Sequence, residues 1–246
     1  MPSPTPITTS RKRIKAALKS WNSSLSNGQT ELFRDFVNTT LPMLRGQFLT
    51  QHTPKHILAT LELSFRHATR RSSEAPKVAI ENSSSRTISV LNSMPDQPFI
   101  VDTMHLFLKN AGFDFSTGFN LVFKATRDAD GVLTAIGDAD GVRESLVLLE
   151  CDGNLTEDMT RQSQATLHQN LILSQTMVRD FRPMIRTVER FVERLEVHAE
   201  RRPESAVVSR ESAAFLKWLL HENFVFMGID AGERLGTQTI DRPNFC

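Results

Sequence analysis

Asp-Gln-Pro-Phe-Ile-Val-Asp-Thr, residues 96–103, is the place where a predicted strand turns sharply into a predicted helix. The strand is expected over Thr87–Asn92, where strand-forming residues are bounded by turn signals. Buried-type residues at positions 99, 101, 104 and 106–108 predict the helix, and Gly112 follows it at the position that favours a left-handed cap. The octet therefore joins a strand of a mixed α/β module to the helix that follows it.

Two further strands are expected after this helix. Phe113–Ala125 carries large apolar residues at odd positions, which is the two-residue period of a strand. A hairpin region then repeats Asp-Ala-Asp-Gly-Val at Asp128 and Asp138, before a strand near Glu144–Cys151. The glycine of each repeat comes too early for a helix-loop-helix calcium site, so the repeats favour turns over metal binding.

The chain upstream is predicted to be mostly helical. Residues 1–9 are rich in Pro, Ser and Thr and are expected to be disordered. A basic amphipathic helix begins at Arg11, for which docking on the rest of the protein is favoured over a membrane-surface or transit-peptide role. Further helices are predicted over Thr30–Val37, Leu41–Thr50 and Pro54–Arg70, and a strand over Lys77–Asn82.

Few groups suit metal or covalent chemistry. The spacing of His52, His56 and His67 does not place three imidazoles on one helical face, so we expect surface or packing roles and no metal site. Cys151 and Cys246 provide no disulfide framework, which fits a reducing, cytoplasmic location. The sequence lacks Gly-x-Gly-x-x-Gly and phosphate-loop motifs, so we expect no cofactor site and name no catalytic residue.

Charge and hydropathy exclude two classes of partner. The net charge of +1 gives no field that would attract nucleic acid. No apolar run reaches the roughly 18 residues of a membrane span, and the polar start lacks the apolar core of a signal peptide. We therefore expect neither a nucleic-acid nor a membrane partner.

A long helix is predicted over Thr156–His198, and Pro183 should bend or interrupt it. Its apolar residues alternate steps of four and three, which is a heptad seam. The seam consists of Leu167, Leu171, Ser174, Val178, Phe181, Ile185, Val188, Val192 and Leu195. A sheet can cover the first half, and the second half needs another helix or a second copy of the chain, so we expect self-association.

The C-terminal part is predicted to hold one more helix and one more strand. Residues 200–207 read as a linker, after which Ser209 would cap a helix. That helix is expected to direct Phe215, Leu216, Leu219 and Leu220 inward. Asn223–Ile229 is predicted to be a strand.

Five stretches, in order, resemble the N-terminal region of the large bacterial NAD-specific glutamate dehydrogenases. The octet is similar to the family's Asp-x-Pro-Phe-Leu-Val-Asp-Ser loop. The other four are Arg127–Gly131 (Arg-Asp-x-x-Gly), Glu144-Ser145, Val178–Met184 (Val-x-Asp-Trp-x-x-Met) and Glu211–Gly228 (Glu-x-x-x-Phe-Leu-x-Trp-Leu…Asn-Phe-x-Phe-x-Gly). The sequence departs from the family pattern at two places. Asn120-Leu121 stands where many relatives have His-Pro, and Ile229-Asp230 replaces the usual aromatic and basic residues.

The resemblance implies an α/β (α+β) fold with an ACT-like, ferredoxin-type βαββαβ module. It also implies four segments. These are a flexible basic segment over 1–29, a helical segment over 30–76, the ACT-like domain with its long helix over 77–200, and a helix plus strand that begin a truncated domain over 208–246.

In function, the resemblance implies a regulatory or assembly segment of an enzyme that deaminates L-glutamate with NAD. The catalytic region and the NAD site would lie outside this chain, which alone would be inactive. Expected partners are the rest of its own polypeptide, homo-oligomer partners and an amino-acid effector. The alternative is a free-standing ACT-like module that binds amino acids or proteins.

ACT-like modules bind amino acids where the first strand passes into the first helix, which would make Asp96, Pro98, Phe99 and Asp102 the ligand-binding residues. Against this, Pro95 and Pro98 remove two backbone donors from the loop. Structural use of the loop, with the two carboxylates anchoring or capping the turn, is therefore favoured over sensing.

Overall fold

The computed structural model describes residues 5–23, 25–71, 74–223 and 226–228. The chain divides into two compact units, residues 1–175 and 176–246. The elements in chain order are α1 (Pro6–Lys19), α2 (Asn27–Thr40), η1 (Leu41–Met43), α3 (Gly46–Gln51), α4 (Pro54–Ala68), β1 (Lys77–Ser84), β2 (Thr87–Pro95), α5 (Ile100–Asn110), β3 (Asp114–Arg127), β4 (Leu133–Ile136), β5 (Val142–Asp152), α6 (Glu157–Arg201), η2 (Pro203–Ser205), α7 (Ala206–Trp218) and η3 (Leu219–Asn223).

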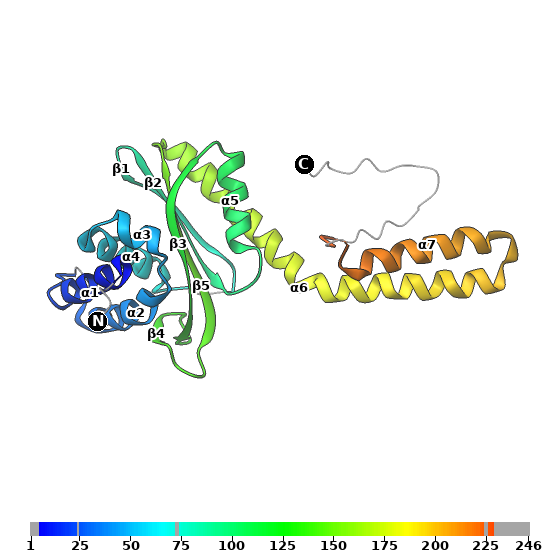
Figure 1. Cartoon of the computed structure of the whole chain (residues 1–246), viewed down its shortest axis with the longest axis horizontal. Coiled ribbons are helices and arrows are strands. Elements are labelled where there is room, and N and C mark those ends of the chain that lie inside the picture. The colour runs from blue at the N-terminus through cyan, green and yellow to red at the C-terminus, as the bar shows by residue number, and fades with distance from the viewer. Residues whose placement is uncertain (1–4, 24, 72–73, 224–225, 229–246) are drawn as a thin grey trace. The chain divides into compact units, whose positions relative to one another are not determined.

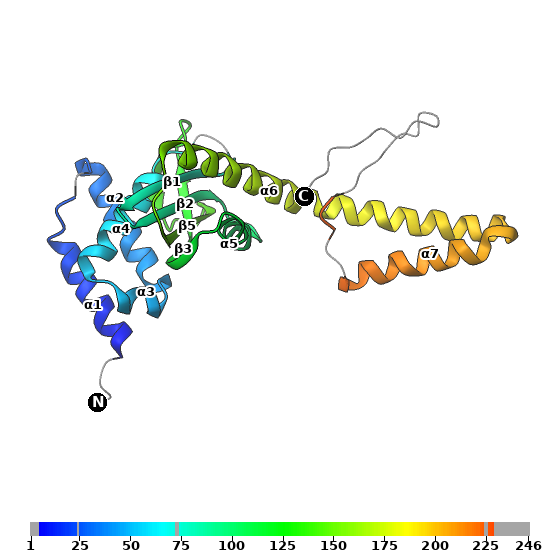
Figure 2. The same ribbon diagram turned by 90° about the horizontal axis from the view of Figure 1, so that it is seen from above.

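The first unit is built on one five-stranded sheet with the order β1-β2-β5-β3-β4, in which every neighbouring pair is antiparallel. Helices α1 to α4 cover one face of the sheet, and α5 lies on the other (Figures 1 and 2). This arrangement confirms the predicted ACT-like α/β module with added helices. The edge beside β2, which the last strand of a βαββαβ order would fill, is occupied by the preceding strand β1.

Both faces of the sheet are buried, because the alternating side chains of the central strand enter two different cores. Leu146 and Leu148 of β5 pack with the core under α1 to α4. Val147, Leu149 and Cys151 pack with the core formed with α5 and the start of α6. β5 therefore shows a run of buried residues rather than a simple alternation of buried and exposed ones.

Local signals decide most element boundaries as predicted. Thr53 accepts a hydrogen bond from the backbone N–H of His56, and Pro54 occupies the first helical position, so α4 begins where expected. Gly112 has a φ of 73° at the end of α5. On β3 the predicted two-residue period is correct for Phe119, Leu121 and Phe123, which are buried.

Several boundaries differ from the predictions. α1 begins at Pro6, within the segment predicted to be disordered, because Thr5 accepts a hydrogen bond from the N–H of Thr8 and caps the helix. The single helix predicted over Leu41–Thr50 is broken at Leu44, which is extended between η1 and α3. None of the helices in the described part of the chain combines the length and apolarity that a membrane crossing needs.

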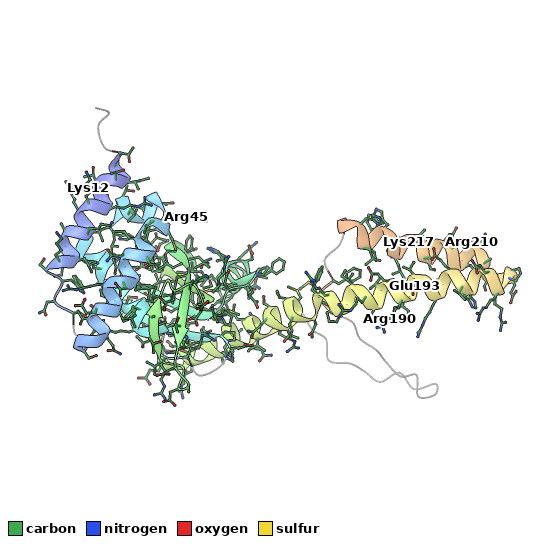
Figure 3. The ribbon with its side chains drawn as sticks, turned by 90° about the horizontal axis from the view of Figure 1, so that it is seen from below. Lys12, Arg45, Arg190, Glu193, Arg210 and Lys217 are labelled. Atoms are coloured by element: carbon green, nitrogen blue, oxygen red, sulfur yellow. The ribbon has the colours of Figure 1, made fainter. Side chains whose placement is uncertain are left out.

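In the second unit, α7 lies beside the second part of α6 (Figure 3). Val188, Val192 and Ala199 of α6 are buried, as are Ser209 and Ala213 of α7. Nζ of Lys217 donates to Oε1 of Glu196 at 2.6 Å. Two residues from the second half of the heptad seam, Val188 and Val192, are therefore buried within this unit, whereas Phe181 is 39% exposed.

The second unit also corrects four predictions. Helix α6 continues through Pro183 to Arg201, and only Arg202 and η2 separate it from α7, so residues 200–207 are a tight connection rather than a linker. Ser209 is buried inside α7 instead of capping it. Phe215, expected to point inward, is 58% exposed. The strand predicted over Asn223–Ile229 is wrong where the structure describes it, because Asn223 belongs to η3 and residues 226–228 are not in a strand; residues 224, 225 and 229 lie outside the described ranges.

Candidate functional site

The octet forms the loop between β2 and α5, and Asp96 fastens this loop to β5. The N–H of Asp96 donates to the carbonyl oxygen of Arg143 at 2.9 Å. Nη2 of Arg143 donates in return to Oδ2 of Asp96 at 2.8 Å. The Arg143 side chain is 68% exposed, so this ion pair contributes at most about 1 kcal/mol to stability. Asp96 therefore anchors the loop, as expected if the loop has a structural role.

Phe99 makes the sharp turn into α5. Its φ of 69° makes it the one non-glycine residue with positive φ in the described ranges, and its ring is 43% exposed. A left-handed conformation costs a side chain of this kind about 1–3 kcal/mol, and such strain is concentrated at functional or tightly determined sites. No sequence signal predicted it, because an aromatic residue has no preference for this backbone region.

The first turn of α5 has no side-chain cap. Phe99 stands at the N-cap position and provides no side-chain hydrogen bond to the helix. Asp102 lies exposed in the first turn, where its charge interacts favourably with the helix dipole, and Pro98 is also exposed. The expectation that Asp102 caps the helix is thus replaced by a purely electrostatic role. Binding of an amino acid by Asp96, Pro98, Phe99 and Asp102 stays a prediction.

A buried ion cluster lies at the same end of the sheet. The Glu144 carboxylate accepts hydrogen bonds from Nε and Nη2 of Arg127, both at 2.7 Å, and from Nη2 of Arg71 at 2.6 Å. The three side chains are at most 12% exposed. Burial alone would raise the pKa of Glu144, but the hydrogen bonds and charges of Arg127 and Arg71 outweigh it and lower that pKa.

The hairpin motif next to this cluster is a turn, as predicted. Oδ1 of Asp128 accepts from the backbone N–H groups of Asp130 and Val132 at 3.0 and 2.8 Å, and Gly131 has a φ of 74°. Arg127 Nη1 also donates to the carbonyl oxygen of Gly131 at 2.8 Å. The octet, the hairpin and Glu144-Ser145 therefore converge at one end of the sheet and make contacts that hold that end together.

The three histidines separate into two environments. His67 Nε2 lies 2.8 Å from the carbonyl oxygen of Lys77, and burial lowers the pKa of His67 to about 4. His52 and His56 instead stack on one another beside Glu150, with ring centroids 4.4 Å apart. Sequence spacing alone did not reveal this pair's neighbour, because Glu150 lies on β5, distant in the chain.

The sheet of the described residues differs from the usual dinucleotide-binding sheet. Their sheet is antiparallel throughout, whereas the usual dinucleotide crevice is built on parallel βαβ units with a glycine-rich turn. We therefore assign no NAD site to this part of the chain.

The comparisons with known proteins agree with the motifs. The model of the glutamate dehydrogenase ACT1 domain matches residues 36–171. The NAD-specific glutamate dehydrogenase of Halomonas elongata is 32% identical over 186 residues, which cover 69% of this chain and 11% of that protein. The enzyme of the same name from Pseudomonas aeruginosa is 26% identical over 196 residues, covering 74% and 12%. No solved structure matches the chain.

The chain thus spans about a tenth of the length of these two curated relatives. The matched family model covers more than half of the chain, including α3 to α5 and the complete sheet. It also contains the octet, the hairpin and the Glu144 cluster. On this evidence the chain belongs to the glutamate dehydrogenase ACT1 domain family.

Proposed function

We propose that this chain is the regulatory or assembly segment of an NAD-dependent glutamate dehydrogenase. L-Glutamate would be converted with NAD to 2-oxoglutarate and ammonia in a catalytic region outside these 246 residues. The names of the relatives support the activity, and the small fraction of their length that is matched supports a catalytic region elsewhere. Within the proposed enzyme, assembly is the role that the geometry favours.

The observation that carries the assembly role is the outward face of α7. Val207, Val208, Phe215 and Trp218 are 68%, 66%, 58% and 49% exposed. At about 100° per residue, these four side chains fall within an arc of about 100° on the helix. The rings of Phe215 and Trp218 stack, with centroids 6.0 Å apart.

The opposite face of α7 is the one that is buried, and it carries small side chains. Ser209 and Ala213 are buried, while the four large apolar residues named above are exposed. A surface helix of a globular protein normally has the reverse arrangement. An exposed apolar face of this kind is typical of an interaction surface.

We assign this face to the remainder of the chain's own polypeptide in the full-length enzyme. Nearly nine-tenths of the length of the two relatives lies outside the matched segment, so a large partner surface is covalently close. The alternative partner is a second copy of this chain. Self-association of the 246-residue chain through the same face would support that alternative.

Trypsin cleavage tests the assembly role, because α7 contains Arg210 and Lys217 (Figure 3). In the full-length enzyme we expect both sites to be protected, and a Phe215→Asp substitution to make them cleavable. Leu106→Asp, which changes a 59% exposed residue of α5, is the matched control and should leave the protection unchanged. Equal cleavage of the wild-type enzyme and the Phe215→Asp variant would contradict the assignment.

Catalysis is tested separately with the pure 246-residue chain. We expect no reduction of NAD by L-glutamate, and turnover would overturn the proposal. The alternative function is that of a free-standing module that binds amino acids or proteins. The reading frame beyond Cys246 distinguishes it from a segment of a larger enzyme. A continuation that encodes a catalytic glutamate dehydrogenase region supports the segment, whereas a native stop codon after Cys246 supports the free-standing module.

A further inference from the structure

His52, His56 and Glu150 come together where the helical layer meets the sheet. His52 follows the last turn of α3, His56 lies in the first turn of α4, and Glu150 belongs to the central strand β5. Each residue offers one ligand atom, and these atoms all lie within 4.8 Å of one another. Three different parts of the chain thus bring two imidazoles and a carboxylate close together.

The contacts within the cluster hold the rings close together. The planes of the His52 and His56 rings are inclined by 19°, and the centroid of the Phe48 ring lies 4.9 Å from that of the His52 ring. Nε2 of His56 lies 3.7 Å from Oε1 of Glu150. It is also 3.4 Å from Oγ1 of Thr60.

Two groups of the cluster are not fully compensated by hydrogen bonds or opposite charges among the described residues. Nε2 of His52 is buried and has no hydrogen-bond partner among the described residues. Glu150 is only 6% exposed, and within the described ranges its carboxylate forms one ion pair, the 3.7 Å contact with His56. Burying a carboxylate without strong compensation is costly. Burial accordingly raises the pKa of Glu150, against the opposing influence of His56.

Nε2 of His52 is available to a metal ion, because it is buried and has no hydrogen-bond partner among the described residues. A neutral imidazole nitrogen that is buried without a partner is a ready ligand. A divalent cation between the three side chains would satisfy the His52 nitrogen and neutralise the Glu150 carboxylate.

We propose that His52, His56 and Glu150 form a zinc-binding site that ties helices α3 and α4 to β5. Two imidazoles and one carboxylate suit zinc better than they suit magnesium or calcium, because the latter two ions take oxygen ligands. Ligand atoms around a tetrahedral zinc lie about 3.4 Å apart. The pair formed by His56 and Glu150 is already near this spacing, and the His56 side chain, 45% exposed, has room to adjust.

The fourth ligand position is left for water. His52 also lines a hollow of about 300 Å³ with Gln51, Thr53 and Pro54. Since the ligands span the helical layer and the central strand, the ion would act as a cross-link inside the first unit. This role is independent of where glutamate is deaminated.

Calorimetric titration of the metal-free 246-residue chain with zinc chloride tests the site. Cys246→Ser is introduced first, so that the C-terminal thiol does not bind the ion. We expect one ion per chain, and a loss of affinity of at least about ten-fold in His56→Ala and in Glu150→Gln. His168→Ala on α6 is the matched control and should bind as the parent does.

Cobalt absorption provides a second readout in the same proteins. Co²⁺ in a tetrahedral site gives intense visible bands, which we expect in the parent and in His168→Ala and not in His56→Ala. If Glu150→Gln does not fold, His56→Ala decides alone, since its side chain is half exposed and its loss leaves the core intact. Absence of binding by the parent, or equal affinity in His56→Ala, would overturn the proposal.

Discussion

Replacing Glu144 by Gln tests whether the Arg71–Glu144–Arg127 cluster holds the motif end of the sheet together. The substitution keeps the size of the side chain and removes its charge. The carboxylate accepts three hydrogen bonds from arginine nitrogens, and its side chain is 2% exposed. Charge-assisted hydrogen bonds contribute about 1.5–3 kcal/mol each.

The three bonds together set an upper limit of about 4.5–9 kcal/mol on the stability that the substitution can remove. The loss is smaller than this limit, because the glutamine oxygen still accepts hydrogen bonds. Removing one partner of a buried ion pair costs about 3–5 kcal/mol, because the remaining charges lose their counter-ion. We therefore expect Glu144→Gln to lower the free energy of unfolding of the first unit by about 3–5 kcal/mol at pH 7. Glu81→Gln, a change at an exposed site of β1, should alter it by less than about 0.5 kcal/mol.

The pH dependence follows from the lowered pKa of Glu144. A carboxyl group with a lowered folded-state pKa contributes stability that is complete above its ordinary value of 4.5 and is lost as the pH falls through the folded-state value. The difference between the parent and Glu144→Gln should therefore shrink below pH 4.5.

Urea unfolding followed by Trp21 fluorescence measures this difference. Trp21 and Trp218 are the two tryptophans, so a Trp218→Phe background leaves one probe, in the first unit. The Trp21 indole N–H donates to Glu62 at 2.6 Å, which couples its emission to the fold of that unit. A loss below about 1 kcal/mol at pH 7, or a difference that grows on acidification, would refute the reasoning.

Three further predictions concern single groups. Cys151 is buried, and its pKa is raised to about 12, chiefly by burial. In a Cys246→Ser background, a thiol reagent should therefore label Cys151 only when urea unfolds the chain. Fast labelling of the folded protein would contradict this prediction. Burial lowers the pKa of His67 from 6.5 to about 4, so the unfolded chain binds an extra proton between these values and stability falls as the pH falls from 6.5 to 4. His67→Gln should flatten this part of the stability curve, and an unchanged slope in urea titrations would refute it. Calorimetry with a panel of amino acids should detect binding that Asp96→Ala abolishes if the β2–α5 loop is a sensor, and silence across the panel in an intact assembly would leave the loop as scaffold.

Local patterns in the sequence were sufficient for much of the fold. The odd-numbered apolar residues of β3, the Thr53-Pro54 start of α4 and the glycine after α5 each act within a few residues, so their effects were predictable. The position of β1 beside β2 was not predicted, since a resemblance to βαββαβ modules places the corresponding edge strand last.

Contacts between residues that are distant in the chain could not be predicted from sequence patterns. Arg71 and Glu144 are 73 residues apart, and the residues between them give no sign of their pairing. Similarly, α7 was expected to bury Phe215 because large apolar residues usually face the core. Instead the small side chains of Ser209 and Ala213 are the buried ones, and the aromatic face lies outward.

Oxidation of Trp218 by hydroxyl radicals tests the assembly role most directly. The side chain is 49% exposed, and Phe115 on β3, 47% exposed, is an internal reference in the first unit. We predict fast oxidation of Trp218 in the 246-residue chain at concentrations where it is monomeric, and strong protection in the full-length enzyme. Equal oxidation of Trp218 in the two proteins, relative to Phe115, would contradict the docking of α7 on the rest of the polypeptide.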